Sequence, residues 1–241
     1  MTKAETNIVV IDKLSVSYAR EEQIIENLSL KIRSGEFISV IGRSGTGKST
    51  LLNCIAGLIP YKGEIQRPDR FSYIFQDKSL FPWMSVKENI YFGLDDLSNA
   101  QKKRKLADIL KIIGLPGFEK RYPRELSGGE MQRIAIARSL VYDHPLVLCD
   151  EPFSALDGLT KDSLVNWFAD IIGQQKTFVF VTHSIEDAII LSDRIILLDD
   201  KGIAGEFIID IHRSQRTALR FSKEITDYRE KINNLINKIN K

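Results

Sequence analysis

The sequence predicts an α/β protein built around a mixed, largely parallel sheet, and three observations lead to this fold class. The apolar runs at 146–149 and 178–181 are nearly continuous, which indicates strands buried on both faces, as in a parallel sheet covered by helices. From residue 146 onward, predicted strands alternate with predicted helices. A glycine-rich loop at 42–49 follows a strand and precedes a helix. A chain of 241 residues is long enough for one large domain or for a core domain with an insert.

The N-terminal part predicts three strands and then a helix. Apolar and polar residues alternate over 8–18, 24–32 and 37–41, which is the period of a strand. The third strand leads directly into the glycine loop, and 48–56 reads as a helix that Gly57 ends. Short strands are expected near 64–65 and over 72–75.

From about residue 79 to 142 the pattern becomes helical, which predicts an inserted subdomain. Ser85 with Glu88 three residues later is a capping-box spacing. A second helix is expected over 100–113 and a third after Ser127. The whole chain, 1–241, is then one domain, with its core at 1–78 and 143–212, the helical subdomain at about 79–142 and a helical tail at about 213–241.

The C-terminal part returns to strand–helix alternation. Strands are expected at 146–149, 177–181 and 195–198, with helices at 164–172 and 185–191. Beyond them, apolar residues recur at helical spacing and predict a terminal helix that packs on its own domain rather than on a partner. These residues are Ile225, Tyr228, Ile232, Leu235, Ile236 and Ile239.

Composition excludes several classes of protein. With 34 basic and 32 acidic side chains the net charge is +2, which gives no electrostatic reason to expect a nucleic-acid binder. The N-terminus lacks the apolar stretch of a signal peptide, and no uncharged apolar run reaches the roughly 20 residues that span a bilayer. We therefore expect a cytosolic chain. Cys54 and Cys149 lie far apart in apolar segments, so buried hydrophobic positions are expected rather than a disulfide or metal site.

The loop from Gly42 to Ser49 matches G-x-x-x-x-G-K-S in the strand–loop–helix context that this motif requires. Glycines allow backbone N–H groups to turn toward phosphates, and the helix N-terminus adds partial positive charge. Lys48 is expected to reach the β- and γ-phosphates, and the Ser49 hydroxyl to contact Mg²⁺. The alternative, a glycine-rich turn with an incidental Lys-Ser pair, does not explain the complete motif.

Two carboxylates, Asp150 and Glu151, follow the apolar strand at 146–149. Asp150 is expected to hold Mg²⁺ directly or through water. Glu151 is expected to polarise or position a water for attack on the γ-phosphate. Acids at a strand end are common at turns, but behind a matched phosphate loop they indicate catalysis.

Residues 126–130, Leu-Ser-Gly-Gly-Glu, open another helix. Ser127 and Glu130 again have capping-box spacing, while Gly128 and Gly129 leave the helix N-terminus uncovered. Backbone N–H groups and the helix dipole can then face an anion. A plain helix cap is the simpler alternative for this motif taken alone.

The order of these motifs resembles the nucleotide-binding subunits of ATP-binding-cassette (ABC) transporters, over about residues 8 to 212. The Leu-Ser-Gly-Gly-Glu signature is the most specific element, because other phosphate-loop families lack it. The resemblance implies a P-loop NTPase core with a RecA-like sheet, an N-terminal antiparallel β subdomain and an inserted α-helical subdomain. It also implies that two copies pair head to tail, so that each ATP lies between one chain's phosphate loop and the other's signature.

The resemblance also assigns roles to single residues. Gln76 matches a position that contacts Mg²⁺ or the attacking water, and His183 matches the histidine that contacts the γ-phosphate. Tyr18 matches the aromatic residue that stacks on adenine, although a tyrosine at a strand end often only packs. Asp157 matches the loop that joins the two sites of the dimer. The expected catalytic groups are Glu151, His183 and Lys48, and the expected metal ligands are Ser49, Gln76 and Asp150. Arg43 and Thr46 are expected to act mainly through backbone donors. The residues expected to bind nucleotide are Tyr18, Gly42, Arg43, Ser44, Gly45, Thr46, Gly47, Lys48, Ser49, Thr50, Gln76, Ser127, Gly128, Gly129 and Asp157.

Residues 75–90 resemble the nitrate, sulfonate and taurine importer subgroup, in which a Pro-Trp pair follows the glutamine. Residues 211–216 also resemble that subgroup, which has a strand ending in spaced arginines. Pro82 and Trp83 could instead be core residues. Our hypothesis is that 81–83 lies at a groove that receives a cytoplasmic helix of a permease. The chain departs from the family in a short 62–76 region and in Cys149, which replaces a larger apolar residue.

We therefore expect the ATP-hydrolysing subunit of an ABC importer, with ATP and Mg²⁺ as ligands. The expected partners are a second copy, transmembrane permease subunits and, indirectly, a solute-binding protein, with no nucleic acid. Its expected place is the cytoplasmic face of the cell membrane, held there by the permease. A soluble cassette ATPase acting on DNA or the ribosome is the alternative, but such proteins usually carry a coiled-coil insert or two cassettes. A non-hydrolysing module is less consistent with Lys48, Glu151 and His183. The sequence does not identify the solute.

Overall fold

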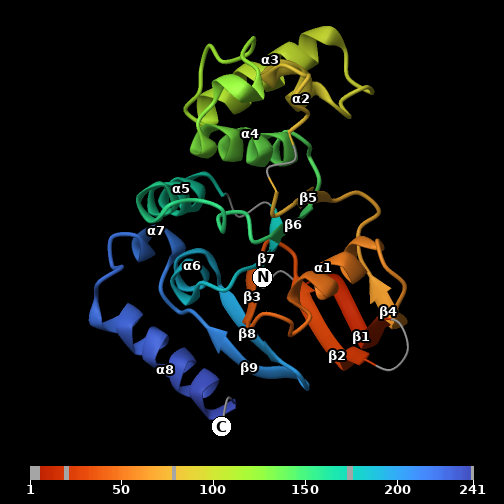
Figure 1. The fold of residues 1–241 in the computed structure, drawn as a ribbon, viewed down its shortest axis with the longest axis vertical. Coiled ribbons are helices and arrows are strands. Elements are labelled where there is room, and N and C mark those ends of the chain that lie inside the picture. The colour runs from red at the N-terminus through yellow and green to blue at the C-terminus, as the bar shows by residue number, and fades with distance from the viewer. Residues whose placement is uncertain (1–5, 19–21, 78–79, 173–175, 240–241) are drawn as a thin grey trace, which may run out of the picture.

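The computed structural model describes residues 6–18, 22–77, 80–172 and 176–239. In this part of the chain the strands form a small and a large sheet, and a block of helices stands apart from both (Figure 1). The small sheet is antiparallel, with strand order β2–β1–β4. Its strands are β1 (Asn7–Tyr18), β2 (Glu22–Arg33) and β4 (Lys62–Gln66).

The large sheet has the order β5–β6–β7–β3–β8–β9, and only its last pair, β8 and β9, is antiparallel. β6 and β7 lie inside it and are buried along nearly their whole length, as their continuous apolar runs predict. β3, predicted from its alternating pattern, is buried in the same way. The α/β fold class with a mixed sheet and a separate antiparallel β unit is therefore confirmed. The strands are β3 (Phe37–Gly42), β5 (Ser72–Ile74), β6 (Leu146–Asp150), β7 (Thr177–Val181), β8 (Arg194–Asp199) and β9 (Gly202–Ile208).

Helix α1 (Lys48–Ala56) is packed between the two sheets. Leu51 and Leu52 belong to one core cluster with Val9 of the small sheet and with Val40 of the large sheet. The helix is apolar on most sides because both sheets cover it. This packing fixes the N-terminus of α1 at the end of β3, where the glycine loop lies.

The helical block contains α2 (Val86–Tyr91), α3 (Asn99–Ile112), a 3₁₀ turn (Pro123–Glu125) and α4 (Gly128–Leu140), and lies at the top of Figure 1. It has a core cluster of its own, which includes Ile90, Leu110 and Ile134. The helices α2, α3 and α4 each begin with a serine capping box, which satisfies N–H groups that the helix itself leaves unpaired. The boxes predicted at Ser85 and Ser127 are thus present.

The remaining helices are α5 (Gly158–Ile171), α6 (Ile185–Leu191), α7 (Arg213–Arg216) and α8 (Lys223–Ile239). Ile225 and Ile232 of α8 are buried in a cluster shared with α6 and the neighbouring strands, as predicted for a terminal helix. None of the helices in the described ranges combines the length and the apolar character that crossing a bilayer needs.

Three local predictions are wrong. Helix α5 begins at Gly158 rather than at 164, because the Asp157 carboxylate caps it by accepting from the N–H of Thr160 at 3.1 Å. Strand β9 was not predicted, because its two glycines and its glutamate interrupt the apolar pattern of a strand. It pairs with β8 at the edge of the sheet. The segment 211–216 is not a strand and contains α7 instead.

Arg216 explains why the chain turns into α7 at this point. Its side chain is only 2% exposed, and its guanidinium donates to the carbonyl oxygens of Ile211 (2.7 Å), Ile209 (3.3 Å) and Ser192. A buried guanidinium needs such acceptors, and a local turn supplies them.

Both cysteines are buried, as predicted. Burial raises the pKa of Cys54 to about 11 and also raises the pKa of Cys149. Neither thiol is therefore poised to react near neutral pH. No group of histidine, cysteine or acidic side chains in the described residues has the arrangement of a metal cluster.

Candidate active site

The loop between β3 and α1 leaves the N-terminus of α1 open. Gly47 is the N-cap residue, with φ of 88°, and as a glycine it has no side chain that could cap the helix. In contrast, Ser127, Asp157 and Ser184 cap α4, α5 and α6 with a side-chain oxygen. The first N–H groups of α1 therefore point at an anion site rather than at a side chain of their own N-cap.

The first residue of the loop must be glycine because the chain approaches itself closely there. A Cβ on Gly42 would lie 2.5 Å from the carbonyl oxygen of Leu198 and 2.8 Å from the hydroxyl of Thr46. Thr46 in turn donates its hydroxyl to the carbonyl of Arg43 at 3.0 Å. The loop is thus held in its curved shape by close backbone packing.

Lys48 is buried at the centre of this loop, with 7% of its surface exposed. Its ammonium donates to the carbonyl oxygens of Gly42 at 3.0 Å and Arg43 at 2.6 Å. Burial lowers the pKa of Lys48, while the nearby carboxylates of Glu151 and Asp150 oppose that shift. The carbonyl oxygens of the loop therefore already orient the ammonium, whose positive charge would offset the negative charge of a bound phosphate.

Ser49 and Asp150 meet although 101 positions separate them, since α1 packs against β6. The Ser49 hydroxyl donates to the Asp150 carboxylate at 2.9 Å. Burial raises the pKa of Asp150, and the bond from Ser49 together with the charge of Lys48 opposes the rise. A hydroxyl beside a carboxylate is an all-oxygen donor pair, which fits Mg²⁺.

Glu151 sits in a strained backbone conformation, with φ of 42°. Its N–H donates to Val181 at 3.0 Å, and its carbonyl accepts from the Ser154 hydroxyl at 2.9 Å. Its carboxylate lies 3.0 Å from Nδ1 of His183. These bonds turn the carboxylate of Glu151 toward the phosphate loop, with the histidine beside it.

Lys48, Ser49, Glu151 and His183 line one cavity of about 490 Å³, and Asp150 adjoins it through its hydrogen bond with Ser49. Gln76 also lines it, and the amide of Gln76 donates to the Ser154 hydroxyl at 3.5 Å. Ile24 of β2 lines one side, a contact that no motif in the sequence predicts. The described residues that line it are Ile24, Ser44, Gly45, Gly47, Lys48, Ser49, Thr50, Gln76, Glu151 and His183.

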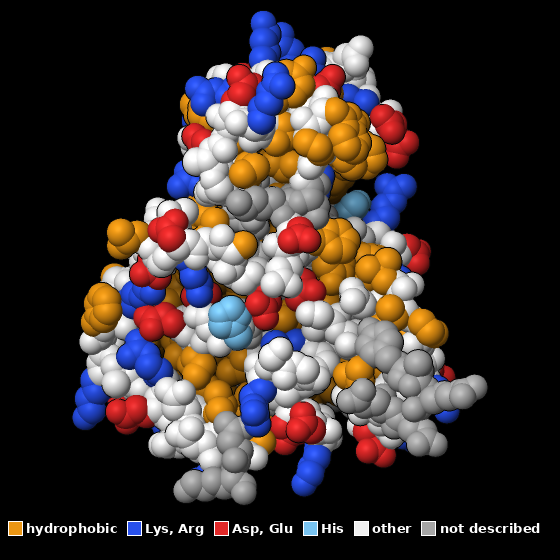
Figure 2. Space-filling view, viewed as in Figure 1, with side chains coloured by type: hydrophobic (Ala, Val, Ile, Leu, Met, Phe, Trp, Pro, Cys, Tyr) orange, Lys and Arg blue, Asp and Glu red, His pale blue; other side chains and the backbone are white. Residues whose placement is uncertain are grey.

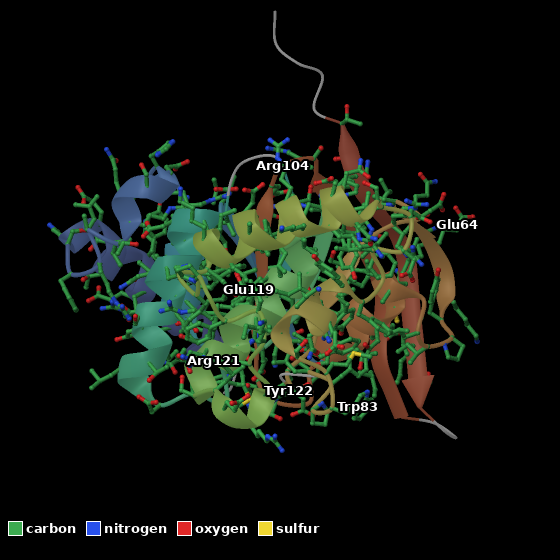
Figure 3. The ribbon with its side chains drawn as sticks, turned by 90° about the horizontal axis from the view of Figure 1, so that it is seen from above. Glu64, Trp83, Arg104, Glu119, Arg121 and Tyr122 are labelled. Carbon is green, nitrogen blue, oxygen red and sulfur yellow. The ribbon has the colours of Figure 1, made fainter. Side chains whose placement is uncertain are left out.

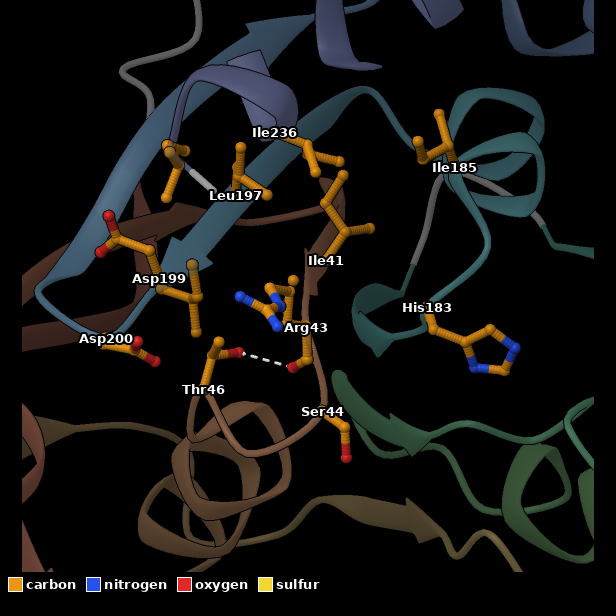
Figure 4. A pocket seen from close by; sticks show the side chains of 13 residues that line it. Ile41, Arg43, Ser44, Thr46, His183, Ile185, Leu197, Asp199, Asp200 and Ile236 are labelled. Carbon is orange, nitrogen blue, oxygen red and sulfur yellow. Dashed lines mark hydrogen bonds between the residues drawn. The ribbon is translucent and has the colours of Figure 1, made fainter. Parts of the chain in front are cut away.

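A second cavity of about 310 Å³ lies on the other side of the phosphate loop. Gly42, Arg43 and Thr46 line this second cavity and not the first, so the predicted loop residues divide between two faces. Figure 4 shows Ile236 of α8 above Arg43, with Asp199 at the side.

The signature residues lie elsewhere. Ser127, Gly128 and Gly129 open α4 in the helical block, and among the described residues around the first cavity none of them appears. The Ser127 N–H donates to the Glu130 carboxylate at 2.7 Å, so this motif also caps its helix. Asp157 is exposed at the start of α5 and is likewise absent from that lining. The side chain of Tyr18 lies outside the described residues.

Sequence reasoning also missed Asn89, which shapes the segment 81–85. Asn89 is fully buried in α2. Its amide oxygen accepts from the N–H of Phe81 at 2.8 Å, and its nitrogen donates to the carbonyls of Phe81 (3.1 Å), Met84 (3.0 Å) and Ser85 (3.1 Å). Nothing in the sequence marks an asparagine one turn inside a helix as the organiser of the preceding loop.

This segment borders a groove of about 540 Å³ between the helical block and the body. Hydrophobic side chains lie on both sides of that hollow in Figure 2. Trp83 is 70% exposed, which contradicts the core alternative for this residue, and it lies at the rim of the molecule when seen from above (Figure 3). The groove is lined by Phe71, Ser72, Tyr73, Phe75, Phe81, Phe92, Arg138, Ser139, Tyr142 and His144.

Comparisons with known proteins agree with this geometry. The family model for ABC transporters matches residues 25–154. The chain is 43% identical over 208 residues to the aliphatic sulfonates import ATP-binding protein SsuB 2 of Mesorhizobium japonicum, covering 85% of this chain and 82% of that protein. It is 41% identical over 215 residues to the corresponding SsuB of Bacillus subtilis, covering 85% and 84%.

Solved structures give the same result. The chain superimposes with a TM-score of 0.72 on the dimeric, post-hydrolysis structure of the ATP-binding cassette MJ0796 bound to ADP and Pi. The two sequences are 30% identical, and the match covers 85% of this chain and 100% of that one. Family match, relatives and fold together show that the chain belongs to the ABC transporter family, as the nucleotide-binding subunit of an importer.

Proposed function

We propose that this chain hydrolyses ATP to drive the import of a small solute through a membrane permease. The observation that carries the proposal is the single cavity in which Lys48, Ser49, Gln76, Glu151 and His183 meet at the open N-terminus of α1. The named relatives import aliphatic sulfonates, so a sulfonate is the solute class to test first. Those relatives also favour an importer over a cassette that acts on DNA or the ribosome.

The phosphate groups of ATP fit the loop 42–49, where the N–H groups of α1 and the Lys48 ammonium offer positive charge. Ser49 and Asp150, with Gln76 nearby, are the residues that would hold Mg²⁺. When bound, Mg²⁺ supplies positive charge that offsets the phosphate charge. We assign Tyr18 to adenine stacking, on the family resemblance alone.

Glu151 positions the attacking water, and His183 orients the carboxylate of Glu151 through their 3.0 Å contact. Replacing Glu151 with Gln removes the carboxylate but keeps the side-chain size. Turnover should fall by several powers of ten, each worth about 1.4 kcal/mol of barrier, and an ATP-bound dimer should accumulate. Steady-state phosphate release and gel filtration with ATP measure both effects.

The control for this experiment is Glu64→Gln, on the exposed strand β4, which should leave turnover unchanged. A Glu151→Gln enzyme that hydrolyses ATP at the wild-type rate would remove Glu151 from the mechanism.

We further propose that two copies pair so that Ser127, Gly128 and Gly129 of one chain face the ATP of the other. In one chain these residues lie on the helical block, apart from the phosphate-loop cavity, and their helix start can still present N–H groups to an anion. Asp157, exposed at the start of α5, belongs to the same face of the proposed dimer. The related cassette MJ0796 is dimeric.

The groove beside the segment 81–83 is the proposed permease contact, which would hold the chain at the inner face of the cell membrane. The groove is apolar and borders the helical block, and Trp83 stands exposed next to it. We take 79–142 as the subdomain that transmits this contact, 1–78 and 143–212 as the core, and 213–241 as the tail. A solute-binding protein would act through the permease.

Trp83→Ala should then abolish solute uptake in a reconstituted transporter while ATP hydrolysis by the isolated chain stays near normal. Tyr61→Ala, at another exposed aromatic residue that precedes strand β4 of the small sheet, serves as the control. Loss of both activities in the Trp83 variant, or of neither, would contradict the contact.

A further inference from the structure

Four charged side chains join the C-terminal segment to helices α5 and α6. Arg220, in the turn before α8, donates from Nη2 to Asp162 of α5 and from Nε to Glu186 of α6, each at 2.8 Å. Arg229 of α8 donates to the second oxygen of Glu186 at 3.2 Å. We call Arg220, Arg229, Asp162 and Glu186 the tail clamp.

The tail clamp is more buried than an ordinary surface ion pair and contains more hydrogen bonds. Only 14% of the Arg220 side chain is exposed, and its planar guanidinium contacts carboxylates from two different helices at once. Two directed, charge-assisted hydrogen bonds from one fork fix the orientation of both acceptors, which a lysine ammonium does less well. Isolated exposed pairs, in contrast, contribute little.

The clamp acts on the parts of α5 and α6 that lead into the site. Helix α5 begins at its cap Asp157, and Asp162 follows within two turns. Helix α6 begins at Ile185, after its N-cap Ser184, which follows His183 in the chain, and Glu186 lies in its first turn. In Figure 1 the tail segment and α7 lie against α5 and α6, on the side of the body away from α1.

A second ion pair ties the same two helix starts together. Lys161 of α5 lies 2.9 Å from the buried carboxylate of Asp187 of α6. This pair sets the distance between the helices, while the tail clamp holds both of them from outside. Two sets of ion pairs, formed by neighbouring residues of α5 and α6, therefore hold the helix starts that follow Asp157 and His183.

We infer that the tail clamp is a positioning device for ATP hydrolysis: Arg220 keeps His183 and Asp157 in register with Glu151 without contacting nucleotide. This inference rests on the proposed function, because it assigns Arg220 to that reaction. It gives the segment after residue 216 a role that the phosphate-loop cavity alone does not require.

The test is Arg220→Gln in the full chain, measured by steady-state ATP hydrolysis and by binding of a fluorescent ATP analogue. Turnover should fall about tenfold, as expected when a catalytic group is misplaced. The KM and the affinity for the analogue should stay within about twofold, because the phosphate loop is untouched. Arg220→Lys should recover part of the turnover.

Arg104→Gln is the matched control, since Arg104 forms an exposed pair with Asp108 at 3.9 Å on α3 and should change nothing. An Arg220→Gln chain with a lower melting temperature but unchanged turnover would reduce the clamp to a structural role and overturn the inference. If the Arg220→Gln chain does not fold, the same measurements are made on Asp162→Asn, which weakens one ion pair of the clamp. Unchanged turnover in that variant would likewise overturn the inference.

Different measurements would refute the proposed function itself, independently of the Arg220 result. If the wild-type chain does not hydrolyse ATP, or if Glu151→Gln stays active, the site assignment is wrong whatever the Arg220 variant does. A double variant, Arg220→Gln with Glu186→Gln, adds an internal check. Losses of turnover that simply multiply would contradict a shared clamp, while losses no larger than that of Arg220→Gln alone would support it.

Discussion

At the scale of single residues, the site concentrates opposite charges in a partly buried space. Burial works against the charged form of both Lys48 and Asp150, and the opposite charges of these two groups partly offset that effect on the pKa of each. Such a site lowers the free energy of unfolding of the ligand-free enzyme, and binding of the charged ligand offsets this loss.

Asp150→Asn tests that cost. Because the folded-state pKa of Asp150 lies above its unfolded value, the folded chain binds this proton more tightly, and the carboxylate costs stability once the pH rises above about 3.9. The amide can still accept from Ser49. The variant should therefore have a higher unfolding free energy near neutral pH, with the difference shrinking as the pH falls, yet lose Mg²⁺-dependent hydrolysis.

Urea denaturation of the nucleotide-free protein across the acid range measures this difference. A variant that is less stable than wild type near neutral pH would show that Asp150 contributes more to the fold than its burial costs.

The sequence predicted the residues of this site more completely than their contacts. Lys48, Ser49, Asp150 and Glu151 belong to local motifs, whose spacing encodes their place on a strand end or helix start. The contact of Glu151 with His183 depends on β6 and β7 being neighbours, and the role of Ile24 depends on the small sheet packing over the loop. Contacts between segments that are distant in the chain produce no sequence motif with a fixed residue spacing.

At the scale of elements, helix starts divide into capped and open ones. The Ser127 box and the Ser98 box have the same geometry, each with a serine hydroxyl accepting from the third N–H at 3.3 Å. Ser127→Ala and Ser98→Ala should thus each cost about 1 kcal/mol of stability. Only Ser127→Ala should also lower ATP turnover, which phosphate release at saturating ATP would show.

Equal turnover in these two serine variants would mean that Ser127 is only a helix cap. That is the simpler interpretation of the motif taken alone.

Asn89→Ala tests the element that carries the groove. Removing the amide leaves the carbonyls of Phe81 and Met84 without this buried donor, so the unfolding free energy should fall by about 1–3 kcal/mol. The exposed Asn99, at the start of α3, gives a control variant that should stay within about 0.5 kcal/mol of wild type. Thermal or urea unfolding compares the two, and equal stability would contradict the role of Asn89.

Element prediction failed at three places, once through an overlooked local cap and twice through tertiary contacts. Helix α5 starts earlier than its apolar spacing suggests, because Asp157 caps an exposed first turn. Strand β9 exists because β8 offers it an edge, and α7 forms where buried Arg216 needs carbonyl acceptors. The buried strands and the serine capping boxes at Ser85 and Ser127, whose signals are local, were predicted correctly.

At the scale of the whole molecule, we propose that one chain carries two half-sites. The phosphate-loop cavity holds Lys48, Glu151 and His183, while Ser127 lies on the separate helical block. We therefore propose that another copy supplies this second set of N–H donors to each cavity.

The most direct test mixes two inactive chains, Lys48→Ala and Ser127→Glu, and measures ATP hydrolysis of the mixture. If sites form between chains, each mixed dimer contains one site with both lesions and one that is intact, so hydrolysis should rise above that of either variant alone. If Lys48 and Ser127 served the same ATP within one chain, mixing would leave hydrolysis at the level of the separate variants, and the account of two half-sites would be wrong.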